Sequence, residues 1–75
     1  MGFAKMVGTI TKVILERGFG FIRERGSTDR KEIFFHRSQL GRGLVFDEQL
    51  IERSVRFDVK HTYAGIQAVD IRPLD

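Results

Sequence analysis

Aromatic and basic side chains alternate with glycine in one short segment of the sequence. Arg17, Phe19 and Phe21 occupy every second position, with a glycine between each pair. Residues two apart in a β-strand lie on the same face, so both phenylalanine rings would share one side of a sheet. A ring in solvent can stack on the π-face of any nucleobase, and nearby cations can contact phosphates. The spacing therefore favours a surface for unpaired bases, although two phenylalanines buried on an ordinary core face fit the same pattern.

A second short segment offers the same chemistry. In the segment 32–36, Ile33 and Phe35 share one face of a strand, whereas Phe34 and His36 share the other. If Ile33 and Phe35 belong to the core, then Phe34 and its neighbour His36 face solvent. Basic side chains around them would add phosphate contacts, and an arginine can also stack on a base. The candidate nucleic-acid-binding residues are Lys12, Arg17, Phe19, Phe21, Phe34, His36 and Arg37.

Other functional classes lack support in the sequence. There is no cysteine, so the chain can form neither a disulfide nor a thiolate metal site. The two histidines, His36 and His61, have no carboxylate cluster of metal-ligand spacing, and Ser38 has no base beside it in a catalytic motif. The glycines of the segment 18–20 do not match a phosphate-binding loop. We therefore expect no metal, no cofactor, no catalytic residue and no enzymatic activity.

The chain is short and unevenly charged. Its 75 residues allow one small domain with a thin core, and an apolar fraction of 41% is typical of a globular protein. Residues 1–45 carry nine basic and four acidic side chains, whereas residues 46–75 carry a net charge of −2. A polyanion would therefore meet the N-terminal half first. Because there is neither a signal-peptide pattern nor an apolar run of about 20 residues, the sequence predicts a cytoplasmic protein without a membrane span.

Five strands are expected to position these side chains. Alternating or β-branched segments predict strands over residues 6–15, 19–25, 32–36, 54–60 and 66–71. In the long connection between the third and fourth strands we expect two short helical turns, one through residues 39–40 that Ser38 would cap and one over residues 47–53. This pattern is typical of a small, closed, five-stranded antiparallel β-barrel, in which closure removes exposed strand edges. We expect one domain over residues 1–75, with residues 1–5 disordered.

The alternation within the strands also predicts the interior. In each strand, the face that carries aliphatic side chains is expected to form the core. Phe46, in the long connection, fits either a lid over the barrel or the rim of the binding surface. Pro73 is expected to end the pairing of the last strand. The predicted core consists of Ile10, Ile22, Phe35, Val55, Phe57, Val59 and Ile71.

Two ordered motifs resemble those of the cold-shock domain family. Residues 17–22, Arg-Gly-Phe-Gly-Phe-Ile, are similar to the family's (Lys/Arg)-Gly-(Phe/Tyr)-Gly-Phe-Ile motif, and residues 33–36 are similar to its second motif. Residues 65–71 look like the family's closing segment, with Ile and Asp in place of Pro and Asn. The resemblance covers about residues 6–74. It implies a barrel of the OB type that binds single-stranded RNA or DNA, with base-stacking roles for Phe19, Phe21, Phe34 and His36.

The sequence departs from the family pattern at several positions. The family's first-strand Trp and Phe are replaced by Lys12 and Val13, and its Lys by Thr11. Arg37 follows the histidine where the family often has an aromatic residue, and Leu44 falls near another such position. Each lost ring removes about 1–3 kcal/mol of stacking per base. We therefore expect weak to moderate, sequence-tolerant binding, in which phosphate contacts of Lys12 and Arg37 increase the dependence on salt.

Two functions follow from these residues. The leading hypothesis is a non-catalytic protein that binds single-stranded RNA or DNA and acts like an RNA chaperone, because capture of unpaired bases shifts hairpins toward the open form. The alternative is a protein-interaction or self-association module that uses the same apolar face, which Val13 and Ile14 would make more aliphatic. The expected partner is single-stranded nucleic acid, and the expected state is a monomer or a weak homodimer.

Overall fold

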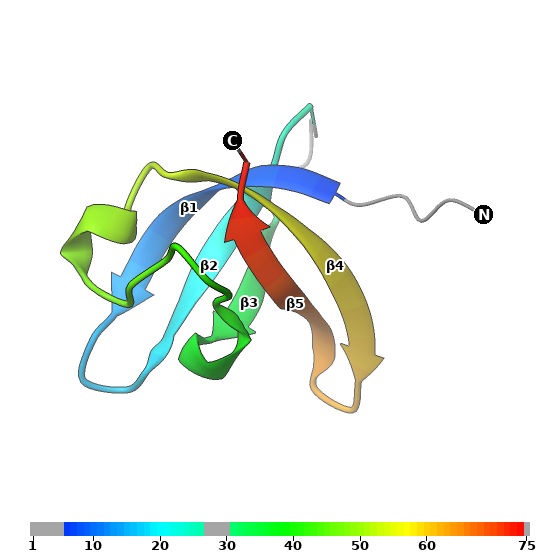
Figure 1. The fold of residues 1–75 in the computed structure, drawn as a ribbon. Coiled ribbons are helices and arrows are strands. Elements are labelled where there is room, and N and C mark those ends of the chain that lie inside the picture. The colour runs from blue at the N-terminus through cyan, green and yellow to red at the C-terminus, as the bar shows by residue number, and fades with distance from the viewer. Residues whose placement is uncertain (1–5, 27–30, 75) are drawn as a thin grey trace.

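Five strands close into a barrel. The computed structural model describes residues 6–26 and 31–74. The strands are β1 (Met6–Ile14), β2 (Phe19–Glu24), β3 (Glu32–His36), β4 (Ser54–Thr62) and β5 (Gly65–Pro73). They pair in the order β1-β2-β3-β5-β4, and pairing between β1 and β4 closes the sheet (Figure 1). The fold class predicted from the sequence is confirmed.

The strands pair in antiparallel fashion everywhere except between β3 and β5. These two strands are parallel, with Phe34 beside Gln67 and Phe35 beside Ala68. Parallel neighbours need a long crossover connection, which is provided here by the chain that includes β4. As a result, a strand from the C-terminal end of the chain lies directly beside the strand that carries Phe34.

The predicted strand boundaries hold to within about two residues, with one correction at the end of β5. Pro73 still pairs with Val55, so it does not stop the pairing before its own position. The pairing even continues past it, because the Leu74 N–H donates to the Ser54 carbonyl of β4 at 3.2 Å. The disorder expected at residues 1–5 and most of the predicted turn at residues 26–30 lie outside the described residues.

The core lies where the inward faces of the strands meet. Of the predicted core residues, only Val59 is not fully covered; it is partly buried and packs against the others. Val59 directly precedes the exposed end of the β4–β5 hairpin, residues 60–66. Leu44 and Leu50 are buried as well, although the long connection that carries them shows no alternation. The buried cluster consists of Ile10, Ile22, Phe35, Leu44, Leu50, Val55, Phe57, Ala68 and Ile71.

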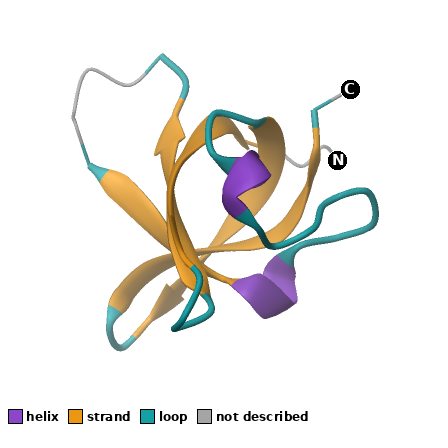
Figure 2. Cartoon of the chain, turned by 90° about the vertical axis from the view of Figure 1, so that its left-hand side faces the viewer, coloured by secondary structure: helices purple, strands orange, loops and turns teal. Residues whose placement is uncertain are grey.

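The connection between β3 and β4 covers one end of the barrel. It contains two 3-10 helices, η1 (Arg37–Gln39) and η2 (Glu48–Leu50) (Figure 2). Phe46 packs edge-on against Phe35, with ring centroids 6.4 Å apart, so it forms part of the lid. Ser38 is not the cap of η1: the His36 side chain accepts the Ser38 N–H and caps the helix. Within the described ranges, no helix has the length and hydrophobicity that a bilayer span requires.

Candidate nucleic-acid interface

A glycine allows one face of β2 to pack closely against the core. Gly20 is buried, and a Cβ atom placed on it would lie 2.8 Å from the Phe35 ring and closer still to the carbonyl oxygen of Lys12. No side chain fits there, so only glycine permits this face of the strand to lie directly against Phe35. Alternation then places Phe19 and Phe21 on the outer face. The structure therefore contradicts the reading in which these two phenylalanines are core residues.

Three phenylalanine rings gather on the outer surface of β2 and β3. The ring centroids are 5.9 Å apart for Phe19 and Phe21, 5.2 Å for Phe19 and Phe34, and 6.1 Å for Phe21 and Phe34. Phe21 meets both other rings nearly edge-on, an arrangement that aromatic pairs prefer. The register explains the cluster, because Phe21 lies opposite Phe34 across the two strands. All three residues remain partly exposed, and we call them the aromatic platform.

A β-bulge brings Lys12 to the aromatic platform. Ile10 pairs with a core residue of β2 but Lys12 pairs with Phe21, so Thr11 is an extra residue in β1. Such an extra residue reverses which of the following side chains point inward. Without it, Lys12 would pair with Gly20 on the core face. With it, Lys12 is exposed, and its Nζ atom lies 5.8 Å from the centroid of the Phe21 ring, within cation–π distance.

Because of the same bulge, the outer face is less aliphatic than the protein-interaction hypothesis expected. Val13 pairs with Gly20 and packs against the core, so it does not lie on the platform side as the protein-interaction hypothesis assumed. Ile14 pairs with Phe19, lies on the platform side and is partly exposed. Of the two aliphatic residues, only Ile14 therefore contributes to the outer surface.

His36 has a defined orientation beside the platform. It is exposed and lies opposite Phe19 in the β2–β3 ladder. Its Nδ1 atom accepts the backbone N–H of Ser38 at 3.1 Å and lies 2.9 Å from the hydroxyl of the same residue. A neutral imidazole that accepts at Nδ1 carries its proton on Nε2. That N–H group can donate a hydrogen bond to a base or a phosphate.

Two of the predicted arginines lie near the turn between β1 and β2. The Arg37 N–H donates to the Gly18 carbonyl at 2.9 Å, and the Arg37 side chain passes beside Gly18, which has a φ of 77°. Arg17 is exposed within the turn, where its N–H donates to the Ile14 carbonyl at 3.1 Å. The structure thus brings Arg37 to the platform edge by packing, whereas Arg17 is near only because it precedes Phe19 in the chain.

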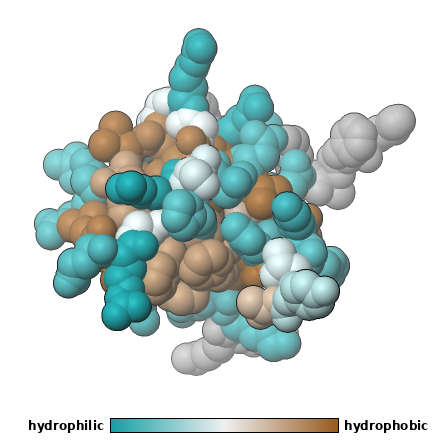
Figure 3. Space-filling model, turned by 90° about the horizontal axis from the view of Figure 1, so that it is seen from below, coloured by the Kyte–Doolittle hydropathy of each residue, from teal (hydrophilic) through white to brown (hydrophobic). Residues whose placement is uncertain are grey.

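The structure adds residues that sequence reasoning did not assign to the site. The parallel pairing of β3 and β5 places Gln67 next to Phe34. A hollow of about 240 Å³ beside Phe34 is lined also by Thr62, Ala64 and Ile66 of the β4–β5 hairpin. Seen from the end that carries this hairpin, the surface shows apolar side chains emerging among hydrophilic ones (Figure 3). No local pattern marks these residues, because their position depends on which strand pairs with β3.

Comparisons with known proteins bear on this surface. A model of the 'Cold-shock' DNA-binding domain family matches residues 6–74. The fold is similar to that of a solved structure described as Drosophila Unr CSD456, with a TM-score of 0.75 and 28% sequence identity, over 99% of this chain. This chain covers only 28% of the length of that one. A search of the curated proteins gave no match. Since the family model spans nearly the whole barrel, the chain belongs to the cold-shock domain family, a family of nucleic-acid-binding domains.

Proposed function

We propose that this protein binds single-stranded RNA or DNA by stacking unpaired bases on Phe19, Phe21 and Phe34, without catalysing a reaction. The proposal depends chiefly on one observation: these rings lie within 5.2–6.1 Å of one another on the outside of the barrel. Each is only partly covered, whereas the adjacent Phe35 is completely buried. A cluster of apolar rings left in solvent marks an interaction surface, and base stacking uses such rings regardless of sequence.

Cationic and polar groups border the platform and supply its second source of affinity. Lys12 lies over Phe21, Arg37 lies beside the turn that precedes Phe19, and His36 lies opposite Phe19. For contacts of this kind with a single strand, log K falls by about 0.7 per contacted phosphate for each unit increase in the log of the salt concentration. Stacking is much less sensitive to salt, so the salt dependence reports the phosphate contacts separately.

Capture of unpaired bases gives activity like that of an RNA chaperone. A ligand that binds only the open form of a hairpin shifts the equilibrium toward that form by its differential affinity. Stacking accepts every base, so the effect extends over many sequences. This mode of action requires no nucleotide hydrolysis.

A titration with a short oligo(dT) or oligo(U) tests the proposal by NMR. We expect the largest shift changes in the rings of Phe19, Phe21, Phe34 and His36. Changes confined to other surfaces would contradict base stacking on the platform. Sedimentation with and without the oligonucleotide tests the alternative: self-association through the platform would give a dimer that the oligonucleotide dissociates or cannot bind.

Lys12→Trp is expected to tighten oligonucleotide binding and to make it less sensitive to salt. An indole beside Phe21 adds a stacking surface of about 1–3 kcal/mol. Loss of the ammonium group removes one phosphate contact and reduces the slope of log K against log salt by about 0.7. Fluorescence anisotropy of a labelled oligo(dT) at several salt concentrations measures both quantities.

Lys12→Gln separates the two effects of this substitution. It removes the charge without adding a ring, so we expect weaker binding with the same reduction in slope. An unchanged slope in Lys12→Gln would show that Lys12 does not contact a phosphate.

A further inference from the structure

Three arginines share one rung of the barrel, away from the aromatic platform. Arg56 of β4 pairs directly with Arg72 of β5. On its other side, Arg56 pairs with Val7 of β1, and the Val7 carbonyl accepts the backbone N–H of Arg25 at 2.8 Å. The rung therefore runs from the end of β2 across β1 and β4 to β5. We call Arg25, Arg56 and Arg72 the arginine band.

The side chains of the band are exposed and keep most of their cationic surface. Arg56 donates from Nη2 to the Leu74 carbonyl at 3.2 Å, and a carbonyl does not neutralise its charge. Arg72 pairs through Nε with Asp70 Oδ1 at 3.2 Å, yet its side chain remains 61% exposed. Arg25 is exposed in the turn that follows β2. All three guanidinium groups can therefore reach an anion in solvent.

The placement of two of these arginines is electrostatically unfavourable, although Asp70 pairs with one of them. Like charges directly opposite one another in an antiparallel pair repel, and Arg56 and Arg72 form such a pair. Arg42, from the long connection, adds a further cation, since it lines a hollow of about 500 Å³ together with Arg72 and Asp70. A bound polyanion would attract each of these cations and so offset the repulsion between them.

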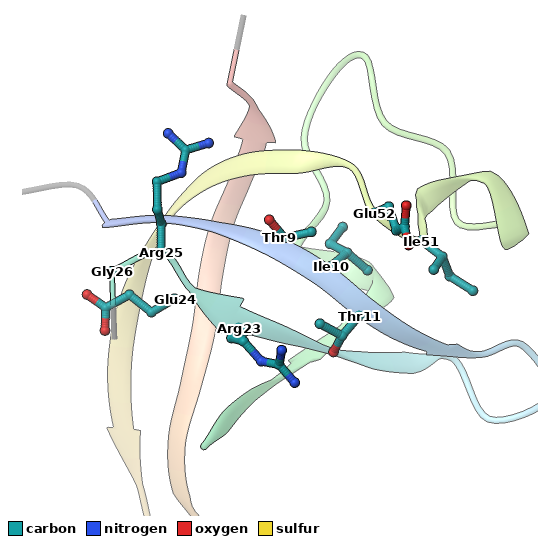
Figure 4. Close-up of a pocket in the computed structure, with 9 residues that line it drawn as sticks. All are labelled: Thr9, Ile10, Thr11, Arg23, Glu24, Arg25, Gly26, Ile51 and Glu52. Atoms are coloured by element: carbon teal, nitrogen blue, oxygen red, sulfur yellow. The ribbon is translucent and has the colours of Figure 1, made fainter. Parts of the chain in front are cut away.

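A continuous surface leads from the aromatic platform to the arginine band. Arg23 follows Phe21 on the outer face of β2, and with Arg25, Thr9 and Thr11 it lines a groove of about 550 Å³ along β1. Figure 4 shows the Arg25 side chain projecting beside the crossing of β1 and β4. At about 3.3 Å per residue along a strand, Arg25 lies roughly 13 Å from Phe21.

Three carboxylates limit the charge of this groove without closing it. Glu24 and Glu52 both belong to its lining. Glu24 points away from Arg25 in the same view, and Glu52 lies beside Ile51, away from Arg25. Glu32 lies 3.7 Å from the Arg23 guanidinium, whose side chain is still 52% exposed. The cationic surface is therefore strongest at the band itself, which begins with Arg25 in the lining of the groove.

We propose that the arginine band binds phosphates of the same single strand whose bases stack on the aromatic platform. The strand would continue along the groove beside β1 and cross from β1 to β4 and β5. Arginine suits this ligand because its guanidinium matches phosphate geometry in a bidentate manner and reads no base. This inference rests on the proposed function, and it predicts that the salt dependence of binding increases with the length of the oligonucleotide.

Oligo(dT) of four and of twelve nucleotides tests the band. For the wild-type protein, the slope of log K against log salt is expected to be steeper for the 12-mer by roughly 2, since three further phosphates contribute about 0.7 each. In R25Q/R56Q/R72Q, the slope for the 12-mer should fall to that of the 4-mer, while binding of the 4-mer is unchanged. The slope is the readout because a longer oligonucleotide gains affinity merely by offering more binding positions.

Matched variants make the outcome decisive. R25K/R56K/R72K keeps the three charges and should keep the slope of the wild type. The triple glutamine variant should melt at the same temperature as the wild type or above it, because a repulsive pair is removed. R25Q alone, at a residue that follows the end of β2, should lower the slope of log K against log salt by about 0.7. Equal 12-mer slopes for the wild type and these glutamine variants would overturn the proposal. Failure of the 4-mer to bind the wild type would instead overturn the proposed function.

Discussion

Combined substitution of Phe19, Phe21 and Phe34 by alanine is expected to abolish measurable binding of oligo(dT) while the barrel stays folded. Each ring contributes about 1–3 kcal/mol of stacking, so the loss is roughly 3–9 kcal/mol, or at least about a hundredfold in affinity. All three rings lie outside the buried cluster and are partly exposed. Their removal therefore leaves no cavity in the core and costs little stability.

Anisotropy with a labelled oligonucleotide measures the affinity, and circular dichroism with thermal unfolding measures the fold. Tyr63→Ala serves as a control, because Tyr63 is a fully exposed aromatic residue at the tip of the β4–β5 hairpin and is not among the ring pairs of the described residues. We expect wild-type affinity for that variant. A folded triple variant that still binds normally would refute stacking on the platform, and an unfolded one would show that the rings support the core.

Phe35→Ala is expected to have the opposite effect, although Phe35 is adjacent to Phe34 in the chain. The Phe35 side chain is fully buried, packs against Phe46 and closely approaches Gly20. Truncation of a buried phenylalanine costs about 3–5 kcal/mol. Proteins have total stabilities of about 5–15 kcal/mol, and a domain of this size belongs at the low end of that range. We therefore expect a protein that is largely unfolded at physiological temperature.

Urea or thermal unfolding followed by circular dichroism measures this loss. Saturating oligo(dT) should partly restore the fold of Phe35→Ala, because a ligand that binds only the native state stabilises it by mass action. Phe35→Leu fills most of the same space and should lose far less stability. A Phe35→Ala variant as stable as the wild type would contradict the assignment of Phe35 to the core.

Local alternation in the sequence was sufficient to predict much of the fold and to group the rings on one face, whereas the resemblance to the cold-shock domain family favoured the outer surface for that face. The period of two in β2 separates Phe19 and Phe21 from Gly20, and the same period in β3 separates Phe34 from Phe35. Two adjacent strands with this pattern place three rings together as soon as they pair. The number of strands and most of the buried residues follow from the same periodicity.

The sequence identified Lys12 as a candidate phosphate contact, but the way its side chain reaches the aromatic platform was decided by the tertiary structure alone. The extra residue Thr11 reverses the sides of the residues after it, which turns Lys12 toward Phe21 and Val13 toward the core. The Thr11 hydroxyl donates to Glu32 Oε2 at 2.7 Å, a contact with a residue 21 positions away. A bulge is thus a property of two paired strands, and the sequence of one strand does not reveal it.

The sequence by itself determined which side chains share a face within each strand, because that alternation is a local property of an extended backbone. Only the tertiary structure decided which faces meet across strands. Gln67 lies beside Phe34 because β5 runs parallel to β3, and Arg56 lies opposite Arg72 because β4 pairs with β5 in one particular register. Register and strand order are set by packing the whole core at once, so they bring together residues that no short segment of the chain could have associated.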